Sequence, residues 1–295
     1  MWIRNLVKLR ERYSGNQLPM PLHRVARACW KMVGKPIVNA SLDSMSRRQQ
    51  FFTTPNWEWK RNLLLGLHEE ETVKLCGRMI KPGMTVFDIG AHVGYFTRQF
   101  SQLVGPRGKV YAFEPNPHTF ALLRTNTARL ANVILVNKAI AATSGTCQLF
   151  LHELEAADSL FEQSEALSSV GVGMISLDDF WRQAAKPDVD FIKMDIEGAE
   201  PGVLRGAGQF FSVQRSLRMV TEYRPESLRA AGIEPEEFLR SLSELGFRYD
   251  AIGAQGNLMP EMPRIEGRKY INLYCEKTLD KSLLPPTVNE SAARP

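Results

Sequence analysis

The chain has 295 residues, 44% of them hydrophobic, and a net charge of +5, which predicts a globular protein with one large core and accessory segments. Its four cysteines are far apart and form no CxxC pair, which argues against a zinc knuckle or a dense disulfide framework and favours a cytoplasmic location. There is no run of about 18 apolar residues, so a membrane-spanning helix is not expected.

Residues 1–80 are predicted to form a mainly helical, basic extension or cap. Residues 1–50 contain ten Lys and Arg against two acids, so the basic character of the chain belongs to this segment. Such blocks are most often solvated surface, but this one could also make a peripheral contact with an anionic membrane or attract a phosphorylated substrate. The sequence gives no indication of the oligomeric state.

From residue 81 to about residue 280, short apolar runs alternate with segments of helical period, which predicts a doubly wound α/β domain with a mainly parallel sheet. An insertion between the third and fourth strands contains a hairpin candidate at 147–152, and residues 281–295 are expected to be a disordered tail. The expected strands are 85–89, 109–113, 133–137, 190–194, 217–221, 249–252 and 270–275, and the expected helices are 95–104, 117–130, 201–210 and 236–245.

The first strand leads into a glycine turn and then a helix. Gly90, Ala91 and Gly94 form this turn, where glycine lets the chain bend sharply and a ligand approach the backbone. Asp88 stands where dinucleotide-binding proteins have their first glycine. A carboxylate there would repel a pyrophosphate but accept a hydrogen bond from an ammonium group, which favours a nucleoside that carries an amino acid.

The second strand ends in an acid, Glu114, followed by Pro115. An acid twenty residues after Gly94 has the spacing of those that accept hydrogen bonds from ribose hydroxyls. Asn137, at the end of the third strand, is either a reader of the base edge or a turn residue.

The fourth strand ends in charged residues that would be costly to bury without a function: Lys193, Asp195, Glu197 and Glu200. Glu222 ends the fifth strand and should lie near the same rim of the sheet. Asp195 and Glu197 could also bind a divalent cation through oxygen, but no metal is predicted. Glu200 is equally interpreted as an acid in the first turn of a helix.

Five separated segments together resemble the FkbM family of methyltransferases over about residues 82–225. They are 88–94, 113–116, 175–179, 193–200 with 206–207, and Glu222. The resemblance implies a class I methyltransferase, Rossmann-like fold with seven strands, the last inserted antiparallel. It also implies methyl transfer from S-adenosylmethionine to a hydroxyl, often on a sugar, glycolipid or natural product. His92 stands where the family often has Asn.

We therefore predict two groups of site residues. The cofactor-binding group is Asp88, Gly90, Ala91, Gly94, Glu114, Pro115, Asn137 and Asp195. The group that serves a small-molecule or glycan acceptor is Asp195, Lys193, Glu197 and Glu222, where a carboxylate acts as base and Lys193 stabilises an alkoxide.

Two alternatives come from other functional classes. A nucleotide-dependent oxidoreductase would need the missing first glycine and a hydride-transfer site, and a non-catalytic binding module would gain nothing from the acids at both ends of the sheet. A nucleic acid is not expected as a partner, because Asp195-Ile196-Glu197 stands where DNA adenine methyltransferases have an Asn/Asp-Pro-Pro-aromatic motif.

Overall fold

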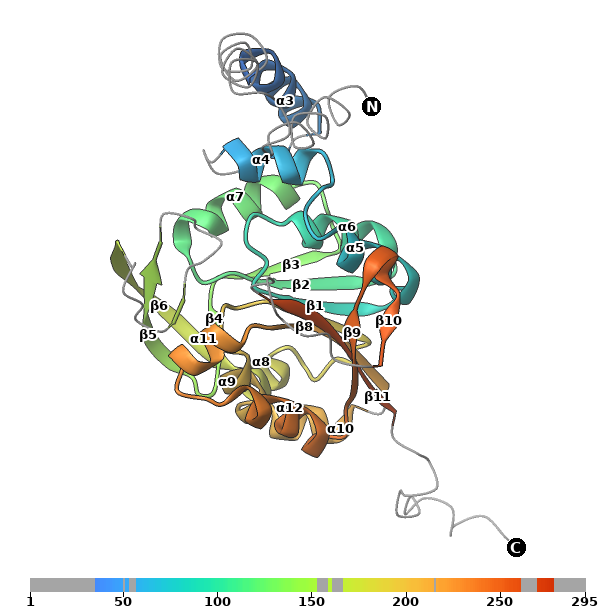
Figure 1. Ribbon diagram of the computed structural model, residues 1–295, viewed down its shortest axis with the longest axis vertical. Coiled ribbons are helices and arrows are strands. Elements are labelled where there is room, and N and C mark those ends of the chain that lie inside the picture. The colour runs from blue at the N-terminus through green and yellow to red at the C-terminus, as the bar shows by residue number, and fades with distance from the viewer. Residues whose placement is uncertain are drawn as a thin grey trace, which may run out of the picture.

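An eight-stranded sheet forms the centre of the protein in its computed structural model (Figure 1). The structure describes residues 35–49, 51–52, 57–152, 159–160, 167–214, 216–260 and 270–278. The strand order is β3-β2-β1-β7-β8-β11-β9-β10. In that order the bounds are Val133–Val136, Lys109–Phe113, Thr85–Ile89, Phe191–Met194, Ser216–Tyr223, Ile271–Thr278, Arg248–Ile252 and Leu258–Met259.

The five strands β3, β2, β1, β7 and β8 run parallel, and β11 is inserted antiparallel between β8 and β9. The doubly wound fold and the antiparallel last strand are therefore confirmed. The sheet has eight strands instead of the expected seven, because the short β10 pairs with β9 at the edge.

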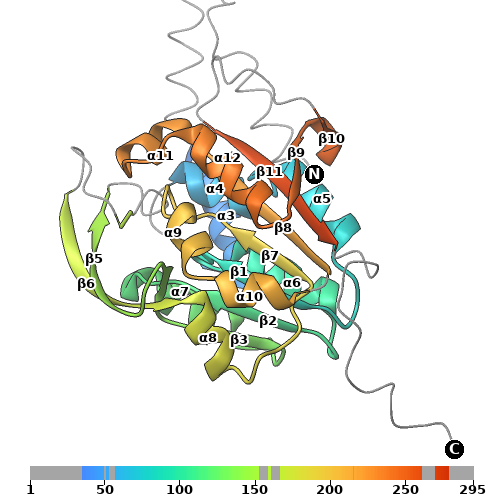
Figure 2. The ribbon, with the colours of Figure 1, turned by 90° about the horizontal axis from the view of Figure 1, so that it is seen from below.

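Helices cover both faces of this sheet (Figure 2). Successive residues of a strand point to opposite faces, so Val86 packs in the core with α5 (Glu70–Met79) and α6 (Tyr95–Val104), whereas Phe87 packs in the core on the other face. The helices on that second face are α8 (Leu177–Gln183), α9 (Glu200–Arg205), α10 (Gly208–Val213), α11 (Pro225–Ala230) and α12 (Pro235–Glu244). Helix α7 spans Pro117–Thr127.

The helix expected over 201–210 is divided in two, α9 and α10, at Gly206. A Cβ atom at Gly206 would lie 2.5 Å from the carbonyl oxygen of Ala141, so the backbone of another segment passes directly against this position. The break therefore depends on a tertiary contact.

The insertion after β3 folds as a separate three-stranded sheet in the order β4-β6-β5. The strands are β4 (Ala139–Ala141), β5 (Gly145–Leu151) and β6 (Ser168–Ser176), and β5 pairs antiparallel with β6. The hairpin candidate at 147–152 thus corresponds to β5, but β6 was not expected. Gly171 and Gly173 weaken its strand pattern.

Helices α3 (Lys35–Gln49) and α4 (Trp57–Leu64) precede the sheet. Leu42, Phe51 and Leu63 from this region form a buried cluster with Val93 of the glycine turn. Residues 1–34 and 279–295 lie outside the described residues, and with them most of the basic segment and the whole tail. The domain boundaries at 80 and 280 stay predictions. Within the described part of the chain, the helices are too short or too polar to cross a membrane.

Candidate active site

The carboxyl ends of the parallel strands define the candidate site. Strand β1 pairs with β2, the next strand along the chain, at one edge, and with β7, a much later strand, at its other edge. Such a reversal of strand order opens a crevice beyond the carboxyl ends, where doubly wound folds bind ligands. Two groups of residues lie there. We call residues 88–94, 114–116 and 137 the glycine-turn end, and Lys193, Asp195, Glu197, Glu222 and Arg224 the carboxylate cluster.

The turn after β1 needs glycine for two reasons. Gly90 and Gly94 have φ angles of 82° and 88°, a region that favours glycine. A Cβ atom at Gly90 would also lie 2.0 Å from the carbonyl oxygen of Asp195. The tight turn is confirmed, and what approaches Gly90 closely is the backbone after β7. The amides of Gly90 and Ala91 both donate to the carbonyl of Phe113, which fixes the turn to β2.

Asp88 is completely buried beneath this turn. Its Oδ2 accepts a hydrogen bond from Thr97 Oγ1 at 2.5 Å, and its Oδ1 has no hydrogen-bond partner in the part of the chain that the structure describes. Burial raises the pKa of Asp88, although the charge of Lys193, its neighbour across β1 and β7, acts in the opposite direction. The expected contact of Asp88 with an ammonium group stays a prediction.

Backbone amides hold the Glu114 carboxylate in place at the end of β2. One oxygen accepts from the amide of His92 at 2.9 Å and the other from the amide of Asn116 at 2.8 Å. The Asn137 side chain donates to the carbonyls of Glu114 and Pro115 at 2.8 and 3.1 Å. The expected residues of the glycine-turn end are thus adjacent in space, and Asn137 holds the loop after β2.

Buried Lys193 forms an ion pair with the partly exposed Asp195 at the end of β7, with Nζ 3.0 Å from Oδ2. Lys193 is 3% exposed, and its ammonium lies 4.7 Å from the ring centre of Phe96. Burial alone would lower the pKa of Lys193, but nearby carboxylates, Asp195 first among them, raise it above its ordinary value. Burial likewise opposes ionisation of Asp195, and the charge of Lys193 outweighs it and lowers the Asp195 pKa.

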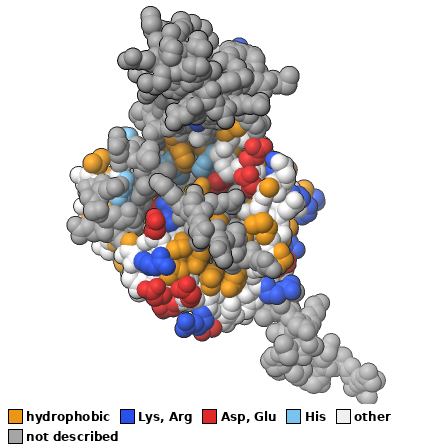
Figure 3. All heavy atoms as spheres, in the orientation of Figure 1, with side chains coloured by type: hydrophobic (Ala, Val, Ile, Leu, Met, Phe, Trp, Pro, Cys, Tyr) orange, Lys and Arg blue, Asp and Glu red, His pale blue; other side chains and the backbone are white. Residues whose placement is uncertain are grey.

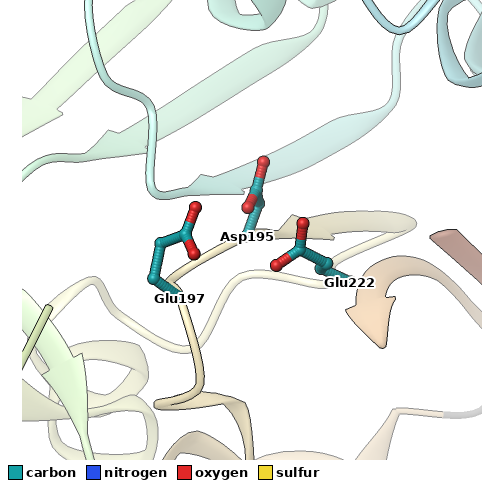
Figure 4. A group of neighbouring side chains, drawn as sticks. All are labelled: Asp195, Glu197 and Glu222. Atoms are coloured by element: carbon teal, nitrogen blue, oxygen red, sulfur yellow. The ribbon is translucent and has the colours of Figure 1, made fainter. Parts of the chain in front are cut away.

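Arg224 joins the other two acids of the carboxylate cluster. Its guanidinium donates to Glu197 and, at 2.9 Å, to Glu222. Burial and the charge of Asp195 raise the pKa of Glu197 to about 8 and that of Glu222 to about 10. In Figure 4 the carboxylates of Glu197 and Glu222 point toward Asp195 from either side.

Comparison with known proteins decides the family at this point. A model described as the methyltransferase FkbM domain matches residues 88–249, more than half of the chain. This chain belongs to the FkbM methyltransferase family. The 2-O-methyltransferase NoeI of Sinorhizobium fredii is 28% identical over 164 residues, which cover 50% of this chain and 66% of NoeI, just under two thirds. The hexuronic acid methyltransferase AglP of Haloferax volcanii is 25% identical over 187 residues, 63% of this chain and 72% of AglP.

Two solved structures also align with this FkbM methyltransferase. Fibrillarin of Aeropyrum pernix, with bound S-adenosyl-L-methionine, has a TM-score of 0.43 and 16% identity over 70% of this chain and 74% of its own. An S-adenosylmethionine-dependent O-methyltransferase of Thermotoga maritima has a TM-score of 0.44 and 14% identity over 74% and 72%.

The residues at both ends of the crevice fit the S-adenosylmethionine on which FkbM methyltransferases depend. Glu114, held by the backbone amides of His92 and Asn116, lies at the end of β2, where doubly wound folds place the acid that binds ribose. Gly94 precedes α6 and has no side chain to cap the first amides of that helix, so these amides suit the carboxylate of the cofactor. The acids of the carboxylate cluster suit the positively charged end of the cofactor.

The structure adds site residues of this FkbM methyltransferase that sequence reasoning missed. Asn272 of β11 donates to Glu69 at 2.7 Å, and the guanidinium of Arg224 lies 5.0 Å from the ring centre of Tyr270. The Nε2 of His68 lies 3.4 Å from a Glu69 oxygen, and burial, with the charge of Lys193 acting in the same direction, lowers the His68 pKa to about 4. No sequence pattern links residues so far apart along the chain.

Backbone strain also marks this region. Glu69, His92 and Glu197 have φ angles of 44°, 49° and 54°, in the left-handed region that residues with a side chain rarely adopt. Such strain concentrates at functional sites because the surrounding structure must hold it. Among the described residues other than glycine, Ala185, Lys186 and Gln255 also have positive φ and lie outside this region, so the strain supports the site only together with the contacts given above. Figure 3, drawn in the orientation of Figure 1, shows histidine side chains (pale blue) and charged side chains (red and blue) at the surface of this face.

Proposed function

We propose that this protein transfers the methyl group of S-adenosylmethionine to a hydroxyl of a sugar, alone or within a glycolipid or natural product. The observation that carries the proposal is the carboxylate cluster, which lies directly against the glycine turn where Gly90 meets Asp195. The printed activities of NoeI, a 2-O-methyltransferase, and AglP, a hexuronic acid methyltransferase, support a sugar hydroxyl as the acceptor.

The proposed division of labour follows the two ends of the crevice. At the glycine-turn end, Glu114 accepts hydrogen bonds from the ribose, and the start of α6 receives the carboxylate of the cofactor. S-adenosylmethionine supplies a sulfonium methyl that is already reactive, so the remaining task of the protein is to align the acceptor and to remove its proton.

The carboxylate cluster would perform that second task. Asp195, Glu197 and Glu222 lie within 4.8 Å of one another, and Asp195, whose pKa is lowered, is the proton acceptor among them that is ionised at neutral pH. Lys193 beside it stabilises the negative oxygen of a hydroxyl that loses its proton. A positioned general base typically adds about 10²–10⁴-fold to the rate. The His68 and Glu69 side chains would form part of the acceptor wall, because they lie next to this cluster.

Calorimetric titration with S-adenosylhomocysteine, with NAD as the comparison, tests the cofactor. Binding of S-adenosylhomocysteine with no response to NAD supports the proposal, and the reverse result rejects it in favour of an oxidoreductase. Incubation of free sugars, uronic acids, lipid-linked sugars and polyketides with radiolabelled S-adenosylmethionine then tests the acceptor. Label in a sugar-containing product that alkali does not release is expected for an O-methyl ether.

A cytoplasmic location and a membrane contact through residues 1–50 complete the proposal. Their support is the cysteine spacing and the local excess of Lys and Arg. Sedimentation with vesicles that contain anionic lipid, compared with neutral vesicles, tests the contact.

A further inference from the structure

Three carboxylates from two strand ends converge in the candidate site. Asp195 and Glu197 follow β7, and Glu222 belongs to β8. One oxygen of each lies within 4.8 Å of the corresponding oxygens of the other two, as Figure 4 illustrates. Three carboxylates at this separation repel one another when they are ionised and water is excluded, so their convergence is favourable only with protons or cations among them.

Protein cations satisfy only part of this need. Lys193 binds one oxygen of Asp195, and Arg224 binds one oxygen each of Glu197 and Glu222. Three carboxylates thus share two protein cations, and the hydrogen bonds to Lys193 and Arg224 use one oxygen of each carboxylate. Each of the three side chains therefore keeps one oxygen for another ligand.

Glu222 provides an observation of a different kind. Its side chain is 5% exposed, and its buried Oε2 has no hydrogen-bond partner among the described residues. A buried carboxylate oxygen without a partner is costly, and native structures seldom retain one without a ligand, ion or water. In Figure 4 the Glu222 carboxylate is directed at the other two, so an additional ligand of this carboxylate would lie beside Asp195 and Glu197.

The donor set indicates the kind of ligand. All three donors are carboxylate oxygens, which hard divalent cations prefer. Two oxygens on opposite sides of an ion at about 2.3–2.6 Å are separated by roughly 5 Å. The observed separation, within 4.8 Å, is therefore within the span of one calcium-sized or manganese-sized ion without movement of the strands.

We propose that Asp195, Glu197 and Glu222 together bind one divalent cation through one oxygen each. The role of this ion rests on the proposed function: next to the glycine turn, it would bind the acceptor hydroxyl and make its proton easier to lose. The binding itself does not depend on that role, so the site can be tested without a methyl acceptor.

The experiment is a titration of the tag-free protein, freed of metal by chelation, with Mn²⁺, in which the spectrum of free Mn²⁺ reports binding. We expect one ion per chain with a dissociation constant below about 1 mM. Glu222→Gln and Asp195→Asn should each weaken binding about ten-fold or more, because each removes a charged ligand. Glu200→Gln is the matched control: it removes a buried acid nearby whose Oε1 already binds the amide of Ile196, so binding should change by less than about three-fold.

Two results would overturn the inference. If the folded parent protein binds no Mn²⁺ up to about 5 mM, the inference is wrong, and Lys193 and Arg224 alone satisfy the carboxylates. Binding that Glu222→Gln and Asp195→Asn leave unchanged, in variants that melt cooperatively, would place the ion elsewhere. Titration of the same samples with S-adenosylhomocysteine separates this outcome from failure of the proposed function, since the two ligands are measured independently.

Discussion

The glycine-turn end is held mainly by backbone, whereas the carboxylate cluster is held by side chains. Glu114 is fixed by two amides, and the turn is fixed to β2 by the carbonyl of Phe113. In the cluster, Asp195 and Glu222 are instead held by the cations Lys193 and Arg224. Backbone contacts tolerate exchange of neighbouring side chains, but a network of charges does not. We expect substitutions in the first region to alter affinity and substitutions in the second to alter the reaction.

The largest expected effect tests the second half of that comparison. Asp195→Asn retains the shape of the side chain but removes its charge, so the rate constant of methyl transfer should fall by about 10²-fold or more. Single-turnover reaction at saturating S-adenosylmethionine measures it, once an acceptor is known. The surface variant Glu276→Gln is the control. An effect mainly on cofactor affinity would instead place Asp195 against the ammonium of the cofactor, and a parental rate would make the cluster structural.

The next prediction concerns the point where the two regions meet. Gly90→Ala places a Cβ atom 2.0 Å from the Asp195 carbonyl oxygen in a backbone with φ of 82°, so it should lower the free energy of unfolding by about 3 kcal/mol or more. Gly83→Ala is a matched control, since Gly83 has φ of 91° and nothing within 4 Å of an added Cβ atom. Its cost should be near 1 kcal/mol, roughly the cost of strain alone. Equal losses in urea unfolding would contradict the close approach.

A smaller effect is expected at the glycine-turn end. Glu114→Gln cannot accept hydrogen bonds from both backbone amides and also serve the ribose, so the dissociation constant for S-adenosylhomocysteine should rise about ten-fold. Glu114→Ala should show the same loss of affinity with an added loss of stability, because it leaves the amides of His92 and Asn116 without their acceptor. Unchanged affinity in calorimetry for both variants would remove Glu114 from the cofactor site.

The last expected effect is a pH dependence of stability. The His68 pKa falls from 6.5 to about 4 on folding because burial disfavours the charged ring. The unfolded chain therefore binds a proton that the folded chain rejects, and the stability that His68 contributes is lost as the pH falls from about 6.5 toward 4. As the pH falls through this window, the melting temperature of His68→Gln should decrease less than that of the parent protein. The same slope in both proteins would refute the shift.

Sequence reasoning succeeded where the determinants are local. The bounds of β1, β2 and α6 match their predictions, because each is an apolar run bounded by glycines or turn residues. It failed for β6, where glycines hide the strand pattern, and at Gly206, where another segment dictates the break. Likewise, the glycine turn was identified as a continuous motif, whereas the proximity of Glu69 to Asn272 depends on the folded topology.

The hydrogen bond from Asn272 to Glu69 also has a consequence for the synthesis of the protein. Its two residues are 203 positions apart, and Asn272 lies on the last described strand, which pairs between β8 and β9. Chains emerge from the ribosome N-terminal end first, so a chain that ends before residue 271 lacks both β11 and the hydrogen bond from Asn272 to Glu69. The wall of the site then stays open. We expect the nascent enzyme to be inactive until this strand has been translated and inserted.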